Sequence, residues 1–67
     1  MAEREIVSII WHQQGDQVDL VYLEGESDRL VGAHDVVAEL ARSVGLVSVP
    51  SASGTIRWVR PTDAGTS

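Results

Sequence analysis

Residues 5–23, EIVSIIWHQQGDQVDLVYL, predict a β-hairpin. Apolar and β-branched residues dominate Glu5 to His12 and Val18 to Leu23, so each run is an expected strand. The polar residues Gln13 to Gln17 between them include Gly15, which suits a turn. Because both faces of the first strand are largely apolar, we expect it to lie in the centre of a sheet or to be covered at an interface.

The two-residue period of a strand assigns side chains to faces. In the first strand, Val7, Ile9 and Trp11 should share one face. The opposite face of that strand should then carry its remaining residues, namely Ile6, Ser8, Ile10 and His12. In the second strand, one face should be formed by Val18, Leu20 and Tyr22.

The segment between this hairpin and the next helix has two interpretations. In the first, Arg29 to Val31 forms a short third strand and a helix begins near Ala33 or His34. In the second, Ser27 caps a longer helix that contains Leu30. The second places Gly32 inside a helix, at a cost of about 1 kcal/mol relative to alanine, so we prefer the first.

The helix itself is predicted from apolar residues at helical spacing. Its inward face should carry Val37, Leu40, Ala41 and Val44, extended by Ala33 and Val36. Gly45 offers a left-handed C-cap, and Leu46 can then pack back on the last turn. This helix should cover one face of the sheet.

Two further strands complete the predicted fold. Val47 to Val49 is short and extended, and Thr55 to Arg60 forms the last strand, stopped by Pro61. A second hairpin is one arrangement open to these two segments. The sequence therefore predicts an α+β domain over residues 1–61, with a small antiparallel sheet of three to five strands, one helix on one face and the order β-β-(β)-α-β. Residues 62–67 are expected to be a disordered tail.

One short helix cannot shield both faces of such an apolar sheet. Some of the large apolar residues should therefore lie on the bare face or at an edge and form an interaction patch; the candidates are Ile6, Ile10, Trp11, Tyr22 and Trp58. A chain of 67 residues also has a marginal core, which favours self-association. We expect a homo-oligomer.

The composition narrows the classes of partner. All five cations are arginines, and the formal net charge is -5, which disfavours a general nucleic-acid binder or binding to an anionic membrane. No apolar run approaches the roughly 18–20 residues of a membrane span, and the N-terminus lacks signal-peptide features. With no cysteine present, we expect a cytoplasmic protein. The absence of lysine hints at coding DNA of high GC content.

The best candidate for a contact surface is the last strand, Thr55 to Arg60. We predict that Trp58, Arg57 and Arg60 bind a partner protein, with Trp11 and Tyr22 as secondary anchors. The plainer interpretation is an amphipathic strand in which Ile56 and Trp58 are core, Arg60 lies at the rim and Arg57 lies on the open face.

Nothing in the sequence indicates catalysis, a metal site or a cofactor. The two histidines, His12 and His34, stand 22 positions apart without a paired ligand motif, and no serine lies in a Gly-x-Ser-x-Gly elbow. The carboxylates Glu24, Glu26 and Asp28 lack the spacing of a calcium loop and are expected to be solvated. We therefore expect a protein that is not an enzyme.

The sequence thus predicts a small non-enzymatic regulatory or accessory protein that acts by protein-protein interaction, with an unidentified protein partner. One alternative is a nucleic-acid-associated regulator that uses the Arg57, Trp58 and Arg60 strand. Another is an acidic decoy that blocks a basic site on a host protein through its carboxylates, namely Asp19, Glu24, Glu26 and Asp28. The hairpin-then-helix order also occurs in small antitoxin-like and phage-accessory domains, an analogy of topology without a matching motif.

Overall fold

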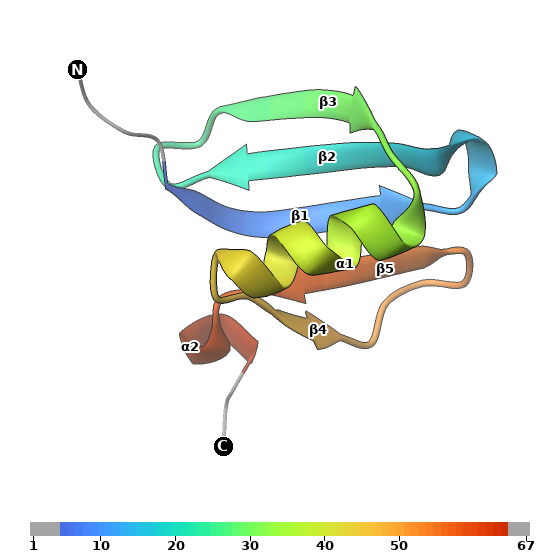
Figure 1. Ribbon diagram of the computed structural model, residues 1–67. Helices are drawn as coiled ribbons and strands as arrows, with labels where there is room; N and C mark the ends of the chain where they lie inside the picture. The colour runs from blue at the N-terminus through green and yellow to red at the C-terminus, as the bar shows by residue number, and fades with distance from the viewer. Residues whose placement is uncertain (1–4, 65–67) are drawn as a thin grey trace.

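The computed structural model describes residues 5–64 and contains a five-stranded sheet with one main helix (Figure 1). The strands are β1 (Ile6–His12), β2 (Gln17–Tyr22), β3 (Ser27–Val31), β4 (Val47–Val49) and β5 (Thr55–Val59). The helices are the 3-10 turn η1 (Gln14–Asp16), α1 (His34–Ser43) and the short α2 (Pro61–Ala64). The predicted α+β class is confirmed.

The strand order is β3-β2-β1-β5-β4, and every neighbouring pair is antiparallel. The β1–β2 hairpin continues into β3, and α1 then carries the chain along one face of the sheet (Figure 1). A second hairpin, β4–β5, places β5 beside β1. The strand β1 therefore lies in the middle of the sheet, as its two apolar faces indicated.

The boundaries of α1 agree with the preferred interpretation of the preceding segment. Residues Ser27–Val31 form an edge strand, and the helix begins at His34. At its C-terminus Gly45 has φ 84°, and its amide donates to the carbonyl of Arg42 (3.1 Å). The Leu46 amide donates to the carbonyl of Ala41 (2.9 Å). These two bonds are those of a Schellman ending, which returns Leu46 to the core.

The core lies between α1 and the sheet. Its buried members are Ile9, Val18, Leu20, Tyr22, Val37, Ala41, Leu46 and Trp58. Only part of the predicted helix stripe is covered, because Leu40 and Val44 remain 36% and 41% exposed. The helix instead turns Ala38, together with Val37 and Ala41, towards the sheet. The small side chains of Ala38 and Ala41 allow the helix to lie close to the sheet, whereas a leucine side chain such as Leu40 in their place would hold the helix further from the sheet.

A β-bulge in β1 changes the predicted face of one residue. Ile6 pairs with Tyr22 while Ser8 pairs with Val21, so Val7 is an extra residue between the two pairs. The alternation of side chains is interrupted at this point. The assignment of Ile6 to the face of Ser8 and Ile10 is therefore wrong, because Ile6 packs against the core cluster under α1.

The predicted disordered tail is wrong for its first residues. Pro61 to Ala64 form α2. Proline suits the first position of a helix because the backbone N–H at that position makes no hydrogen bond within the helix, so its absence in proline costs nothing. The amides of Asp63 and Ala64 donate to the carbonyl of Arg60 (2.8 and 3.0 Å). The remainder of that prediction, residues 65–67, lies outside the described residues.

Candidate functional site

The face of the sheet that points away from α1, here the open face, consists of three rows of side chains. They alternate with core residues such as Ile9, Leu20 and Trp58, which fixes their direction. In the order β3, β2, β1, β5, β4, the valine row is Ser27, Val21, Ser8, Val59 and Val47. The charged row is Arg29, Asp19, Ile10, Arg57 and Val49. The polar row is Val31, Gln17, His12 and Thr55.

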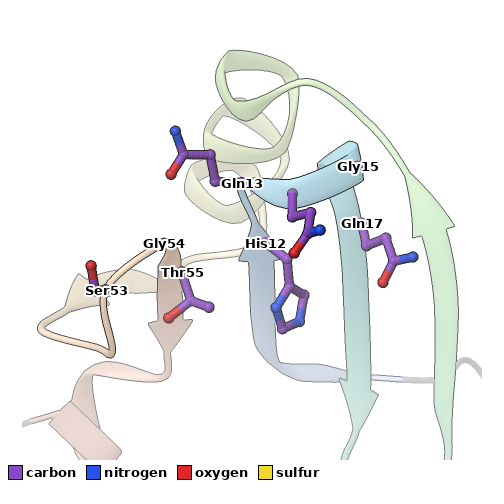
Figure 2. Close-up of a pocket in the computed structure, with 8 residues that line it drawn as sticks. His12, Gln13, Gly15, Gln17, Ser53, Gly54 and Thr55 are labelled. Carbon is purple, nitrogen blue, oxygen red and sulfur yellow. The ribbon is translucent and has the colours of Figure 1, made fainter.

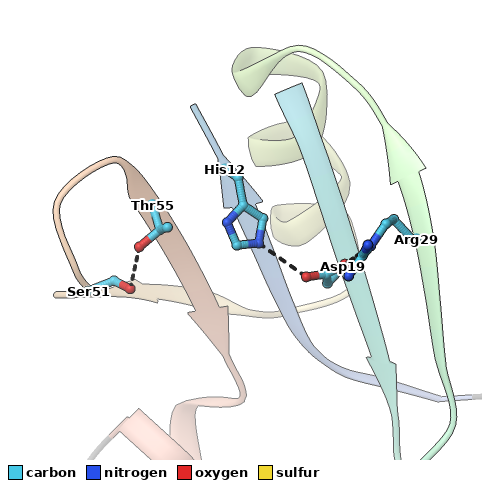
Figure 3. Close-up of polar contacts among 5 residues, drawn as sticks. All are labelled: His12, Asp19, Arg29, Ser51 and Thr55. Atoms are coloured by element: carbon cyan, nitrogen blue, oxygen red, sulfur yellow. Dashed lines mark hydrogen bonds and ion pairs between the residues drawn. The ribbon is translucent and has the colours of Figure 1, made fainter. Parts of the chain in front are cut away.

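Asp19 lies between a histidine and an arginine side chain on this face. Its Oδ2 lies 3.1 Å from Nε2 of His12, and its Oδ1 accepts a hydrogen bond from Nε of Arg29 at 3.2 Å (Figure 3). Burial raises the pKa of Asp19. The hydrogen bonds to His12 and Arg29, together with electrostatic attraction to these two side chains, lower the pKa by more than burial raises it. The pKa of this carboxyl is therefore lowered, and it is a fixed negative charge at neutral pH.

Arg57 stands on the other side of β1 from this cluster. Its cross-strand partners are the half-buried Ile10 and Val49. It is exposed, and among the described residues it makes no ion pair. The charged row thus presents a negative carboxylate on β2 and an unpaired guanidinium on β5, with Ile10 between them.

The valine row is the apolar part of the open face. Val21 is half-buried, Val59 is only 6% exposed and Val47 is 41% exposed. The Oγ of Ser8, in the middle of this row, is buried and makes no hydrogen bond within residues 5–64. Val59 and the Ser8 hydroxyl are therefore already covered within the single chain, and Val21 and Val47 supply the accessible apolar surface of this row.

The polar row ends in a hollow of about 640 Å³ at one end of the sheet. His12 lies at its centre, flanked by side chains of the β1–β2 turn and the β4–β5 loop (Figure 2). The hydroxyls of Ser51 and Thr55 bond to each other at 2.9 Å, and Thr55 also donates to the carbonyl of Ala52. His12 and Asp19 resemble a base with its orienting carboxylate, but in residues 5–64 neither hydroxyl bonds to His12.

The structure separates the residues that the sequence proposed as one contact surface. Trp58 and Tyr22 are 6% and 9% exposed in the core, so neither offers a surface to a partner while the chain is folded. Trp11 is half-buried, and its Nε1 donates to the carbonyl of Gly32 at 3.2 Å. Arg60 donates from Nε to Oδ2 of Asp63 at 3.0 Å. Of the five residues, only Arg57 lies free on the open face.

His34 has a structural role that the sequence analysis missed. Its ring lies 5.1 Å from Trp11 in an edge-on arrangement and 6.0 Å from Trp58, measured between centroids. The sequence pattern does indicate this position, because His34 stands at helical spacing from Val37, Ala38 and Ala41. The histidine therefore continues the inward face of α1.

The described residues give no sign of a metal site or a membrane span. Within residues 5–64, no three histidine or carboxylate side chains are grouped closely enough to hold an ion. Neither helix in this part of the chain has the length and apolarity to cross a bilayer.

Comparison with known proteins does not identify a relative of this chain. No protein-family model, curated protein or solved structure matches this chain. The open face and its three rows are therefore the basis for a functional proposal.

Proposed function

We propose that this protein is a non-enzymatic protein-interaction module whose docking surface is the open face. The observation that carries the proposal is the charged row, in which Arg57 stands exposed beside Ile10 on the face that points away from α1. Arginine is enriched in protein contacts and among the residues that contribute most to their affinity.

The two edges of the sheet are weaker candidates for a docking surface. The outer edge strand β3 contains Asp28 and Arg29, and charges on an edge discourage pairing with another strand. The other edge strand, β4, has three residues, Val47–Val49. A partner strand would therefore gain few backbone hydrogen bonds at β4, and at β3 it would meet charged side chains.

The positions of Arg57 and Trp58 argue against the alternative of a nucleic-acid-associated regulator. Stacking of a nucleic-acid base on Trp58 with a phosphate on Arg57 needs both side chains on one surface, whereas they lie on opposite faces. The proposal therefore favours a protein partner on the open face.

The test places a diazirine crosslinking amino acid at Val21 on the open face or, as a matched control, at Val36, which is 66% exposed on α1. We expect irradiation of cells that make the protein to link a partner, or another copy, to position 21 and not to position 36. Arg57→Glu should remove the product at position 21 while circular dichroism stays unchanged. Crosslinking at position 36 alone, or a product at position 21 that survives Arg57→Glu, contradicts the proposal.

A further inference from the structure

We infer that the occupant of the open face is a second copy of this chain, docked face to face about a two-fold axis parallel to β1. This inference rests on the proposed function, because it uses the same surface. Its basis is the register of the sheet, which places Asp19 and Arg57 of the charged row on opposite sides of Ile10.

The complementarity follows from the positions of two charges. Asp19 on β2 and Arg57 on β5 both pair with Ile10, one strand to either side. Neighbouring strands are about 4.8 Å apart, so both charges stand at nearly equal distances from β1. A two-fold rotation about an axis along β1 exchanges these two sides. Arg57 of each copy then lies opposite Asp19 of the other, with the two Ile10 side chains meeting on the axis.

The other rows match under the same rotation. In the valine row, Val21 lies opposite Val59 of the second copy, and Ser8 lies on the axis. In the polar row, Gln17 lies opposite Thr55 of the second copy. The three central strands therefore match in polarity, whereas at the edges Arg29 lies opposite Val49 of the second copy and Ser27 lies opposite Val47.

A two-fold axis running across the strands gives a worse match. Arg57 would then lie opposite Arg57 of the second copy, and Asp19 opposite Asp19. The valine row would also face the polar row. Like charges in contact cost several kcal/mol in an interface, so the charges select the axis along β1.

A dimer through the edge strand β3 meets a similar obstacle. Antiparallel pairing of two β3 strands centred on Arg29 places two guanidinium groups opposite each other, and pairing centred on Asp28 places two carboxylates opposite each other. Pairing centred on Leu30 avoids both clashes of like charge. In that register, however, two of the five residues of β3 extend beyond the partner strand and pair with no β3 residue. The open face therefore accommodates a second copy better than this edge does.

The size of the surface sets the expected affinity. Five strands about 4.8 Å apart and five residues of about 3.4 Å each give a face of roughly 24 by 17 Å. This flat area of about 400 Å² is below the roughly 800 Å² per partner of a standard interface. We therefore expect a weak dimer, with a Kd of about 10–100 µM.

The first experiment measures solution mass by sedimentation equilibrium up to about 1 mM protein. The native chain should move from 7.2 kDa towards twice that mass as the concentration rises. Arg57→Asp places a new carboxylate against Asp19 of the other copy and should remain monomeric, with an affinity reduced at least tenfold. Asp19→Arg should behave likewise, whereas an equimolar mixture of the two variants should dimerise again because both facing pairs are then attractive.

A second experiment keeps the inference testable if Asp19→Arg does not fold. The chain contains no cysteine, so single substitutions can be linked with a short bis-maleimide. Ile10→Cys, on the axis, should give covalent dimers at about 100 µM protein, whereas Val36→Cys on α1 should not.

The outcomes separate this inference from the proposed function. A native chain that stays monomeric at the highest concentration overturns the homodimer, while crosslinking of another protein through Val21 still supports the open face as a docking surface. A dimer that survives Arg57→Asp and is linked only through Val36→Cys overturns both.

Discussion

Arg57 and Trp58 are neighbours in the chain, yet they lie on opposite faces of the sheet. Arg57 pairs with Ile10 on the open face, and Trp58 pairs with Ile9 in the core. Trp58 is 6% exposed, whereas Arg57 is exposed and free of ion pairs among the described residues. Substitutions at these two positions should therefore have separable effects.

Trp58→Ala should destabilise the fold by about 3–5 kcal/mol, because it removes a large buried ring from a small core. Arg57→Ala should change the free energy of unfolding by less than about 0.5 kcal/mol. Guanidinium unfolding followed by circular dichroism measures both. A Trp58→Ala variant as stable as the native chain would show that this ring is not part of the core.

Gly45→Ala should lower the free energy of unfolding by about 1 kcal/mol, because φ is 84° at the end of α1 and a side chain there is strained. Gly32→Ala is the matched control. Its added Cβ would lie 3.5 Å from Cγ2 of Val37 and 3.9 Å from Cγ2 of Val18, which are ordinary contacts. Thermal unfolding should show a loss only for Gly45→Ala, and equal losses would contradict the Schellman ending.

Asp19 should contribute to stability in a pH-dependent way. The pKa of Asp19 is lower in the folded chain than its ordinary value of 3.8. The carboxylate therefore stabilises the fold fully at pH values above 3.8, and this stabilisation is lost as the pH falls through the pKa of the folded chain. Asp19→Asn should therefore reduce the fall in unfolding free energy below about pH 4, and Arg29→Gln should do so to a smaller extent. Urea unfolding between about pH 2 and 7 measures this. The same pH dependence in all three proteins would exclude the cluster as its source.

His34→Ala should lower the free energy of unfolding by about 0.5–1.5 kcal/mol through loss of its contacts with Trp11 and Trp58. His34→Phe keeps an aromatic ring at this position and should recover most of the loss. Tryptophan fluorescence during guanidinium unfolding reports on both neighbours directly. An alanine variant with native stability would show that the ring contacts contribute nothing.

Much of the fold was predictable because its signals are local. Apolar alternation and the polar turn containing Gly15 identified the first hairpin, and Gly45 with Leu46 identified the end of α1. Ile6 was assigned to the wrong face because a bulge depends on the partner strand, and a single strand carries no sign of it. The tail prediction failed at residues 62–64, where Pro61 was interpreted only as a strand stop and not as a helix start.

The candidate site was less predictable than the fold. The alternation in the last strand separated Arg57 from Trp58, and the plainer interpretation, with Trp58 in the core and Arg57 on the open face, agrees with the structure. The proximity of Arg57, Ile10 and Asp19 depends on the register of three strands. Cross-strand register is a property of the assembled sheet, and the pattern within each strand leaves it undetermined.

The position of β5 has a consequence for how the chain folds. Its contacts with β1 join residues separated by more than forty positions, so the middle of the sheet closes only after all intervening segments have been synthesised. Until then β1 has an open backbone edge, and Ile9 and Trp11 lack part of their cover. Long-range pairing of this kind slows folding and prolongs the exposure of such surfaces. During synthesis, the central strand therefore stays partly uncovered until β5 has been made.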